Sequence, residues 1–146
     1  MTLWSRRRVT ACPDDTLLMT PTLLCVDDDE AMTSMLRATL SARGYLVICA
    51  ATVEEAVRAV EDNPINLVIL DLNLPDEAGF ALFERLKGRI ATAKIPVIMA
   101  SGFATVEARN QASRHGAIAF LQKPYQMQQL LGVIHWAAPA PEPVTT

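Results

Sequence analysis

Five short apolar runs alternate with stretches of helical spacing along this chain. The runs cover residues 23–26, 45–50, 67–70, 97–100 and 118–121. Between them, apolar residues recur three or four positions apart, which is typical of one face of an α-helix. The runs themselves are too short for helices and have the length of buried strands. The pattern therefore predicts five βα units.

The helical stretches indicate which residues each predicted helix buries. Their apolar residues are Met32, Met35, Leu36 and Leu40, then Val53, Ala56, Val57 and Val60, then Phe83, Leu86 and Ile90, and finally Met127, Leu130, Leu131 and Ile134. A weaker helix is expected at about residues 105–115. Gly44 is expected to end the first helix, because glycine readily adopts the left-handed conformation found there. Trp136 is expected to pack at the end of the last helix rather than to be an exposed partner contact.

Five βα units with right-handed crossovers predict an α/β fold, a doubly wound parallel sheet with five helices. The runs at 23–26 and 67–70 are continuously apolar, as expected for strands covered on both faces. In such a sheet, ligands bind beyond the carboxyl ends of the strands, near the point where strand order reverses. The functional site is therefore expected at that edge.

Composition and charge exclude several classes of protein. Hydrophobic residues make up 51% of the 146 residues and charged residues 20%, which indicates a globular chain. The formal net charge of −3 argues against direct nucleic-acid binding, which needs a basic face. No apolar stretch approaches the roughly 20 residues of a membrane span. Cys12, Cys25 and Cys49 lack metal-ligand spacing. Cys25 and Cys49 fall inside apolar runs and are expected to be buried, reduced thiols, which favours a cytoplasmic location.

Three regions differ in pattern. Residues 1–20 show no periodicity and are predicted to be a flexible extension. Residues 21–137 hold all five βα units and are predicted to be one domain. Residues 138–146 are rich in alanine and proline and are predicted to be a disordered tail.

Polar residues follow the predicted strands and should meet at one edge of the sheet. They are Asp27, Asp28 and Asp29 after the first strand, Asp71 after the third, Ser101 after the fourth and Lys123 after the fifth. Neighbouring carboxylates repel one another unless a cation neutralises them, and Mg²⁺ suits an oxygen site open to water. A lysine and a hydroxyl can hold phosphoryl oxygens while a carboxylate acts as nucleophile. These residues predict a magnesium-dependent site of phosphoryl transfer.

Four segments resemble the signature blocks of response regulator receiver domains. They are Val26-Asp27-Asp28, Leu70-Asp71-Leu72-Asn73-Leu74-Pro75, Ile95-Pro96-Val97-Ile98-Met99-Ala100-Ser101 and Phe120-Leu121-Gln122-Lys123-Pro124. They stand in the family's order, each at the end of a strand, and the resemblance spans residues 22–136. It implies a flavodoxin-like sheet with five strands in the order 2-1-3-4-5, and a role in two-component signalling.

The resemblance also implies how the site works. Asp71 would accept the phosphoryl group and, with Asp28 and the backbone carbonyl of Asn73, would hold Mg²⁺, for which Mn²⁺ can substitute. Asp27 would act through a metal-bound water. The phosphoryl group would be bound by Ser101 and Lys123.

A switch is implied as well. Ser101 would move toward the phosphoryl group, and Phe120 would turn inward into the space that it leaves. Pro124 would follow a cis peptide bond. Because Phe120 is not tyrosine, no ring hydroxyl can report its burial through a hydrogen bond.

The sequence departs from the family pattern at a few positions. Three consecutive aspartates leave the register open by one residue. Asp27 and Asp28 are favoured for the site because they directly follow Val26, and Asp29 is then the N-cap of the first helix. Ala78 stands where many family members have an acid.

Two residues bear on the lifetime of the phosphorylated state, which the sequence does not determine. Phe103, two residues after Ser101, could impede the attacking water. Polar Asn73 could instead help to position that water.

The implied partners are a sensor histidine kinase or a histidine phosphotransfer protein, and a downstream protein of unknown identity. The chain is expected to be a non-enzymatic switch, monomeric or dimerising on phosphorylation. His115 and His135 are expected at the surface or its boundary, not as phosphodonors. No output domain is expected after the last helix, which leaves a protein contact or onward phosphotransfer as the output.

Three alternatives remain open. The chain could be the receiver of a hybrid histidine kinase, because residues 101–104 are similar to such receivers. It could be a metal-dependent phosphohydrolase with an aspartyl-phosphate intermediate, although those enzymes usually have aspartate where Asn73 stands. It could also be a receiver-like module that only binds partners.

Overall fold

The computed structural model describes residues 20–74, 79–102 and 105–139. Strands and helices alternate along these residues, as the sequence pattern predicts. The strands are β1 (Thr22–Val26), β2 (Leu46–Ala50), β3 (Leu67–Asp71), β4 (Val97–Ser101) and β5 (Ala119–Gln122). The helices are α2 (Glu30–Ser41), α3 (Val53–Asp62), α4 (Gly79–Lys87), α5 (Val106–His115) and α6 (Met127–Ala137).

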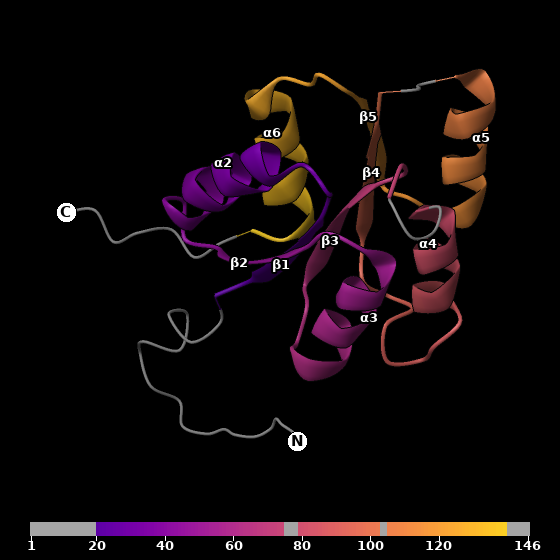
Figure 1. Ribbon diagram of the computed structural model, residues 1–146, viewed down its shortest axis with the longest axis horizontal. Helices are drawn as coiled ribbons and strands as arrows, with labels where there is room; N and C mark the ends of the chain where they lie inside the picture. The colour runs from indigo at the N-terminus through magenta and orange to yellow at the C-terminus, as the bar shows by residue number, and fades with distance from the viewer. Residues whose placement is uncertain (1–19, 75–78, 103–104, 140–146) are drawn as a thin grey trace.

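The strands form one parallel sheet in the order β2-β1-β3-β4-β5 (Figure 1). The predicted fold class and strand order are therefore confirmed. The first strand, β1, lies inside the sheet, and β2 lies at its edge. The chain then crosses back past β1 to form β3 on the other side. Strand order reverses between β1 and β3, which is where an open α/β sheet binds its ligand.

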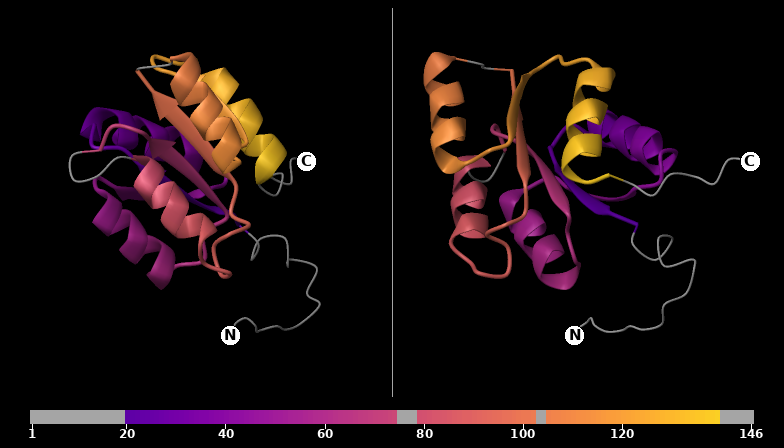
Figure 2. Two further views of the ribbon diagram at one scale, coloured as in Figure 1. Left: turned by 90° about the vertical axis from the view of Figure 1, so that its right-hand side faces the viewer. Right: turned by 180° about the vertical axis from the view of Figure 1, so that it is seen from behind.

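Helices cover both faces of the sheet (Figures 1 and 2). Successive side chains of a strand point to opposite faces, so β1 contributes to two cores. Leu24 and Val26 pack with buried residues of α3, α4 and α5, whereas Leu23 and Cys25 pack with those of α2 and α6. All five residues of β1 and of β3 are buried, which confirms that their continuous apolar runs mark strands covered on both sides.

Ile90 does not belong to the third predicted helix, and that prediction is wrong. Helix α4 ends at Lys87, and Ile90 is 98% exposed. The Lys87 ammonium donates to the carbonyls of Ala93 (2.9 Å) and Ile95 (3.2 Å), and the Thr92 hydroxyl donates to the carbonyl of Leu86 (2.6 Å). These bonds fold the chain back toward β4 directly after the helix.

The end of α6 also differs from expectation. Trp136 is 75% exposed rather than packed, because it lies two residues, or about 200° of helical turn, beyond the buried Ile134. Ala138, in the predicted tail, is buried as the C-cap of α6, and its N–H donates to the Ile134 carbonyl at 2.7 Å. Ala138 is thus part of the packing of α6.

Other expectations agree with the structure. Gly44 has a φ of 95° in the turn between α2 and β2, a conformation that favours glycine. Cys25 and Cys49 are free thiols, the first buried and the second half-buried. No helix among the described residues has both the length and the hydropathy to cross a membrane. Most of the predicted extension and tail, with Cys12, Pro75, Ala78 and Phe103, lies outside the described residues.

Candidate functional site

Three aspartates from two strands meet at the carboxyl edge of the sheet. Asp27 directly follows β1 and Asp71 is the last residue of β3, and these strands are paired in the sheet. One carboxylate oxygen from each of Asp27, Asp28 and Asp71 lies within 4.8 Å of the others. Asp27 and Asp71 are buried, whereas Asp28 is exposed. The cluster therefore has a closed inner side and an outer side open to water.

Asp29 plays a different part from its two neighbours. It is the N-cap of α2, and its carboxylate accepts from the N–H groups of Ala31 (3.0 Å) and Met32 (3.2 Å). Its own N–H donates to Asp27 at 3.0 Å. Capping occupies the Asp29 side chain and turns it toward the helix, so Asp27 and Asp28 are the pair that lies with Asp71.

Lys123 brings a positive charge into the cluster. Its ammonium lies 2.6 Å from Asp27 Oδ2 and 3.2 Å from Asp71 Oδ2, and its side chain is only 20% exposed. The Lys123 N–H donates to the Ser101 carbonyl at 2.8 Å, which fixes the backbone at the end of β5. Burial lowers the pKa of Lys123, but the two carboxylates outweigh it and leave the pKa raised. The side chain is thus a cation that both carboxylates share.

Asp71 is held through both carboxylate oxygens. Oδ1 accepts from the Asn73 N–H at 3.0 Å, while Oδ2 faces Lys123. Burial raises the pKa of Asp71, and the nearby Asp27 charge adds to this, while the Asn73 N–H and Lys123 oppose it. A further cation nearby would stabilise the ionised form of this carboxylate, because the group is partly buried and close to another negative charge.

Ser101 ends β4 beside Asp71 and is almost fully buried, at 1% exposure. The Asn73 side-chain amide lies 3.4 Å from its hydroxyl, a long donor–acceptor separation. The Lys123–Pro124 peptide bond is cis, the isomer that the resemblance implies. Four of the predicted residues, Asp27, Asp28, Asp71 and Lys123, are therefore brought together, with Ser101 and Asn73 at their border.

Phe120 lies farther along the sheet. It is opposite Met99 in the register of β4 and β5, two residues before the level of Ser101. Met99 and Ser101 point to the same face of β4, and Phe120 packs against the core cluster that contains Met99. Ser101 and Phe120 thus lie on the same face of the sheet, but Phe120 packs in the apolar core and not beside the carboxylates.

Gly79 supports the site in a way that residue types alone do not reveal. It is the first residue of α4, and its N–H donates to the Leu72 carbonyl at 2.9 Å. A Cβ on Gly79 would lie 2.6 Å from the Asp71 carbonyl oxygen and 2.8 Å from the Leu72 Cα. The backbone that carries Asp71 therefore has direct contact with the start of α4.

The two histidines lie apart from the carboxylates. His135 is exposed. His115 is half-buried at the end of α5, where its ring lies 5.3 Å from that of Phe80 and 5.5 Å from that of Phe83. Its place at the surface boundary agrees with the prediction, but its ring contacts with α4 were not evident from its spacing in the sequence.

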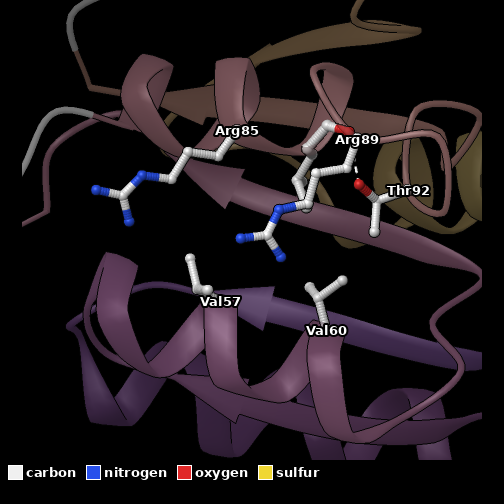
Figure 3. Close-up of a pocket in the computed structure, with 6 residues that line it drawn as sticks. Val57, Val60, Arg85, Arg89 and Thr92 are labelled. Carbon is white, nitrogen blue, oxygen red and sulfur yellow. Dashed lines mark hydrogen bonds between the residues drawn. The ribbon is translucent and has the colours of Figure 1, made fainter.

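A shallow pocket between α3 and α4 is separate from this site (Figure 3). Its lining residues are Val57, Val60, Arg85, Leu86, Arg89 and Thr92. Arg89 pairs with Glu61 at 3.1 Å. None of the lining residues belongs to the carboxylate cluster, so the pocket and the candidate site are different surfaces.

The sequence and the fold are both similar to known proteins. A family model described as response regulator receiver domain matches residues 23–135. The transcriptional regulatory protein KdpE of Mycobacterium tuberculosis is 37% identical over 109 residues, which are 75% of this chain and 47% of that protein. The chain thus spans about half the length of this curated relative.

Solved structures give the same result. The non-phosphorylated HemR receiver domain of Leptospira biflexa has a TM-score of 0.76 and 29% identity, with 86% of this chain and all of that chain covered. A CheY-like response regulator receiver domain protein of Methanospirillum hungatei has a TM-score of 0.75 and 32% identity, covering 80% of this chain and 92% of that one. The fold is therefore shared with these proteins.

Proposed function

Because this chain belongs to the response regulator receiver domain family, we propose that Asp71 is its phosphoacceptor in two-component signalling. The observation that carries this proposal is the shared position of Lys123. Its ammonium touches the carboxylates of both Asp27 and Asp71 at the edge where strand order reverses. A lysine that contacts both an acid next to the proposed metal and the nucleophilic carboxylate is well placed to bind the phosphoryl oxygens.

The three clustered carboxylates fit a magnesium ion. Each offers one oxygen, and the exposed side at Asp28 leaves room for the waters that Mg²⁺ retains. Asp28 and Asp71 would hold the ion with the Asn73 carbonyl, and Asp27 would act through a bound water. Mn²⁺ would substitute. When bound, the ion would supply positive charge to the phosphoryl oxygens.

We infer the transfer step from the protein's own groups. Asp71 Oδ1 is fixed by the Asn73 N–H, so Oδ2, which faces Lys123, is the attacking oxygen. A bond forms between Oδ2 and phosphorus while the bond from phosphorus to the donor histidine nitrogen breaks. That nitrogen keeps the electron pair. After transfer the negative charge lies on the phosphoryl oxygens instead of the Asp71 carboxylate, and the Lys123 ammonium pairs with those oxygens. The Ser101 hydroxyl donates a hydrogen bond to one of them.

The switch follows from the shared face of Ser101 and Phe120. Movement of Ser101 toward the phosphoryl group leaves space along that face of the sheet, and the Phe120 ring fills it. The phosphoryl group thereby favours one of two packings of α5, β5 and α6 because it makes contacts in only one of them.

The phosphoryl donor is a sensor histidine kinase or a histidine phosphotransfer protein, and the output is a contact with a downstream protein. The chain acts in the cytoplasm as a switch without an enzymatic output of its own. The predicted boundaries, with the domain at residues 21–137, are part of this proposal. A longer protein, including a hybrid kinase, is compatible with a relative such as KdpE, of which the matched residues are 47%.

Labelling with a small phosphodonor tests the proposal. Incubated with acetyl phosphate and Mg²⁺, the protein should gain one phosphoryl group that survives acid, is lost in base and maps to Asp71. Chelation of the metal should abolish labelling, because the buried carboxylates would then face the phosphoryl oxygens without enough positive charge. An unlabelled protein, or an adduct on another residue, would contradict the assignment.

Asp28 and Asp29 give a matched pair of variants that separates metal binding from capping. Asp28→Asn should raise the Mg²⁺ concentration needed for half-maximal labelling by about tenfold or more, because the cation loses a charged ligand. Asp29→Asn should leave that concentration near the wild-type value, since asparagine is as good an N-cap as aspartate. Titration of labelling against Mg²⁺ makes the comparison. Equal shifts in both variants would show that the register of the three aspartates is wrong.

A further inference from the structure

Arg109 lies over the ring of Phe120. Its guanidinium carbon is 5.1 Å from the ring centroid, within the range of a cation–π contact. Arg109 belongs to the N-terminal half of α5, and Phe120 is the second residue of β5. The contact therefore joins a helix to the strand that carries the proposed switch residue.

Helix α5 is weakly attached to the rest of the domain. Ala112 is its one buried residue among the ten of the helix. At its C-terminal end, the His115 ring makes tilted contacts with the rings of Phe80 and Phe83 of α4. In the N-terminal half, Arg109 contacts the sheet through the ring of Phe120. A single side-chain contact can consequently change how this end of the helix and the ring lie relative to each other.

The contact is made with the ring in its present place. In this arrangement Lys123 pairs with Asp71, and Phe120 is half-buried at the edge of the core that it shares with Met99 and Ala112. We infer that inward movement of the ring toward the level of Ser101 separates it from the Arg109 guanidinium. The cation–π attraction is then lost.

We propose that Arg109 is a positioning residue that holds Phe120 in the resting arrangement and so opposes phosphorylation of Asp71. This inference rests on the proposed function. Arg109 belongs neither to the residues at the strand ends nor to the cluster of acids, so neither assigns it a role. We call this contact a latch, because it stabilises the resting arrangement. The stronger the contact, the smaller the population of the packing that the phosphoryl group favours.

The sign of the effect distinguishes a latch from simple electrostatics. An arginine elsewhere on the domain attracts an anion, so its removal would weaken anion binding or leave it unchanged. Loss of a latch on the resting arrangement has the opposite effect, because the binding-competent packing becomes more populated and apparent affinity rises.

The test uses beryllofluoride, an anionic phosphoryl mimic, with the whole chain and saturating Mg²⁺. Binding is followed by isotope-edited NMR at the amides of Ser101 and Phe120. Arg109→Gln should bind about two- to fivefold more tightly than wild type, which corresponds to the ~0.5–1 kcal/mol of an exposed cation–π pair. Arg109→Lys keeps a cation and should retain most of the wild-type affinity. Arg114→Gln removes the same charge from an exposed position of α5 and should not tighten binding.

A double-mutant cycle links the effect to the ring. In a Phe120→Leu background, Arg109→Gln should no longer change the affinity, because the π-face is gone. Equal affinity of wild type and Arg109→Gln, weaker binding by Arg109→Gln, or a full effect in the Phe120→Leu background would each overturn the latch. Failure of the wild type itself to bind beryllofluoride would overturn the proposed function and the latch with it.

Discussion

Replacing Asp71 with asparagine is expected to abolish phosphoryl labelling while the domain remains folded. The amide oxygen can still accept from the Asn73 N–H, and the side chain keeps the shape of the original. An amide oxygen carries no negative charge and is a poor nucleophile toward phosphorus. Labelling with acetyl phosphate and Mg²⁺, measured as the fraction of protein that gains one phosphoryl group, should therefore fall to background.

The stability of this variant provides an internal control. Burial and the Asp27 charge raise the pKa of Asp71, so its ionised form is disfavoured in the folded protein. A carboxyl group with a raised folded-state pKa stabilises the fold only below its unfolded-state pKa, and this contribution is lost as the pH rises through the folded-state value. At neutral pH, Asp71→Asn should thus unfold at an equal or higher urea concentration than wild type. Labelling that persists in a folded Asp71→Asn protein would show that another residue is the acceptor.

The strand ends could be predicted from the sequence because their pattern is local. Each apolar run is bounded by a polar residue, and parallel strands bring their carboxyl ends to one edge. The ends of the apolar runs therefore predict that Asp27, Asp71, Ser101 and Lys123 lie at the same edge. The role of Asp29 as N-cap could also be predicted, because capping depends on the few residues that follow.

Other features depend on contacts that no local pattern encodes. Ile90 has helical spacing from Leu86, yet Lys87 and Thr92 bond to carbonyls six to eight residues away, and the chain turns back before Ile90 can join the helix. Trp136 is apolar but falls on the outward side of α6, because the phase of a helix is set by the whole of its buried face. A large apolar residue at the end of a helix is therefore a poor guide to burial.

Contacts within the site show the same limit. The approach of Gly79 to the Asp71 carbonyl joins residues in a strand and the following helix. The position of Arg109 over Phe120 depends on how α5 packs beside β5. Both are tertiary contacts, and the residues next to Gly79 and Arg109 in the sequence give no sign of them. The contacts form only when the helices pack on the assembled sheet.

Gly79→Ala is expected to impair the site without altering any polar group in it. The added Cβ would lie 2.6 Å from the Asp71 carbonyl oxygen and 2.8 Å from the Leu72 Cα, both of which are backbone atoms. The backbone must therefore shift, and overpacking of this kind destabilises a domain by about 1–3 kcal/mol. Because a displacement of about 1 Å in a reacting group can reduce a rate by about 100-fold, labelling of Asp71 should slow by at least about tenfold. Urea unfolding and the initial rate of labelling measure the two effects.

Gly132→Ala is the matched control for this variant. Gly132 lies within α6, and within residues 20–74, 79–102 and 105–139 no atom outside its local backbone lies within 4 Å of the position of its added Cβ. Alanine there should stabilise the helix by about 0.5–1 kcal/mol and leave the rate of labelling unchanged. Opposite changes in stability from the same substitution would locate the effect in the contact between α4 and Asp71. A Gly79→Ala protein that unfolds and labels like wild type would mean that this contact places no constraint on the acceptor.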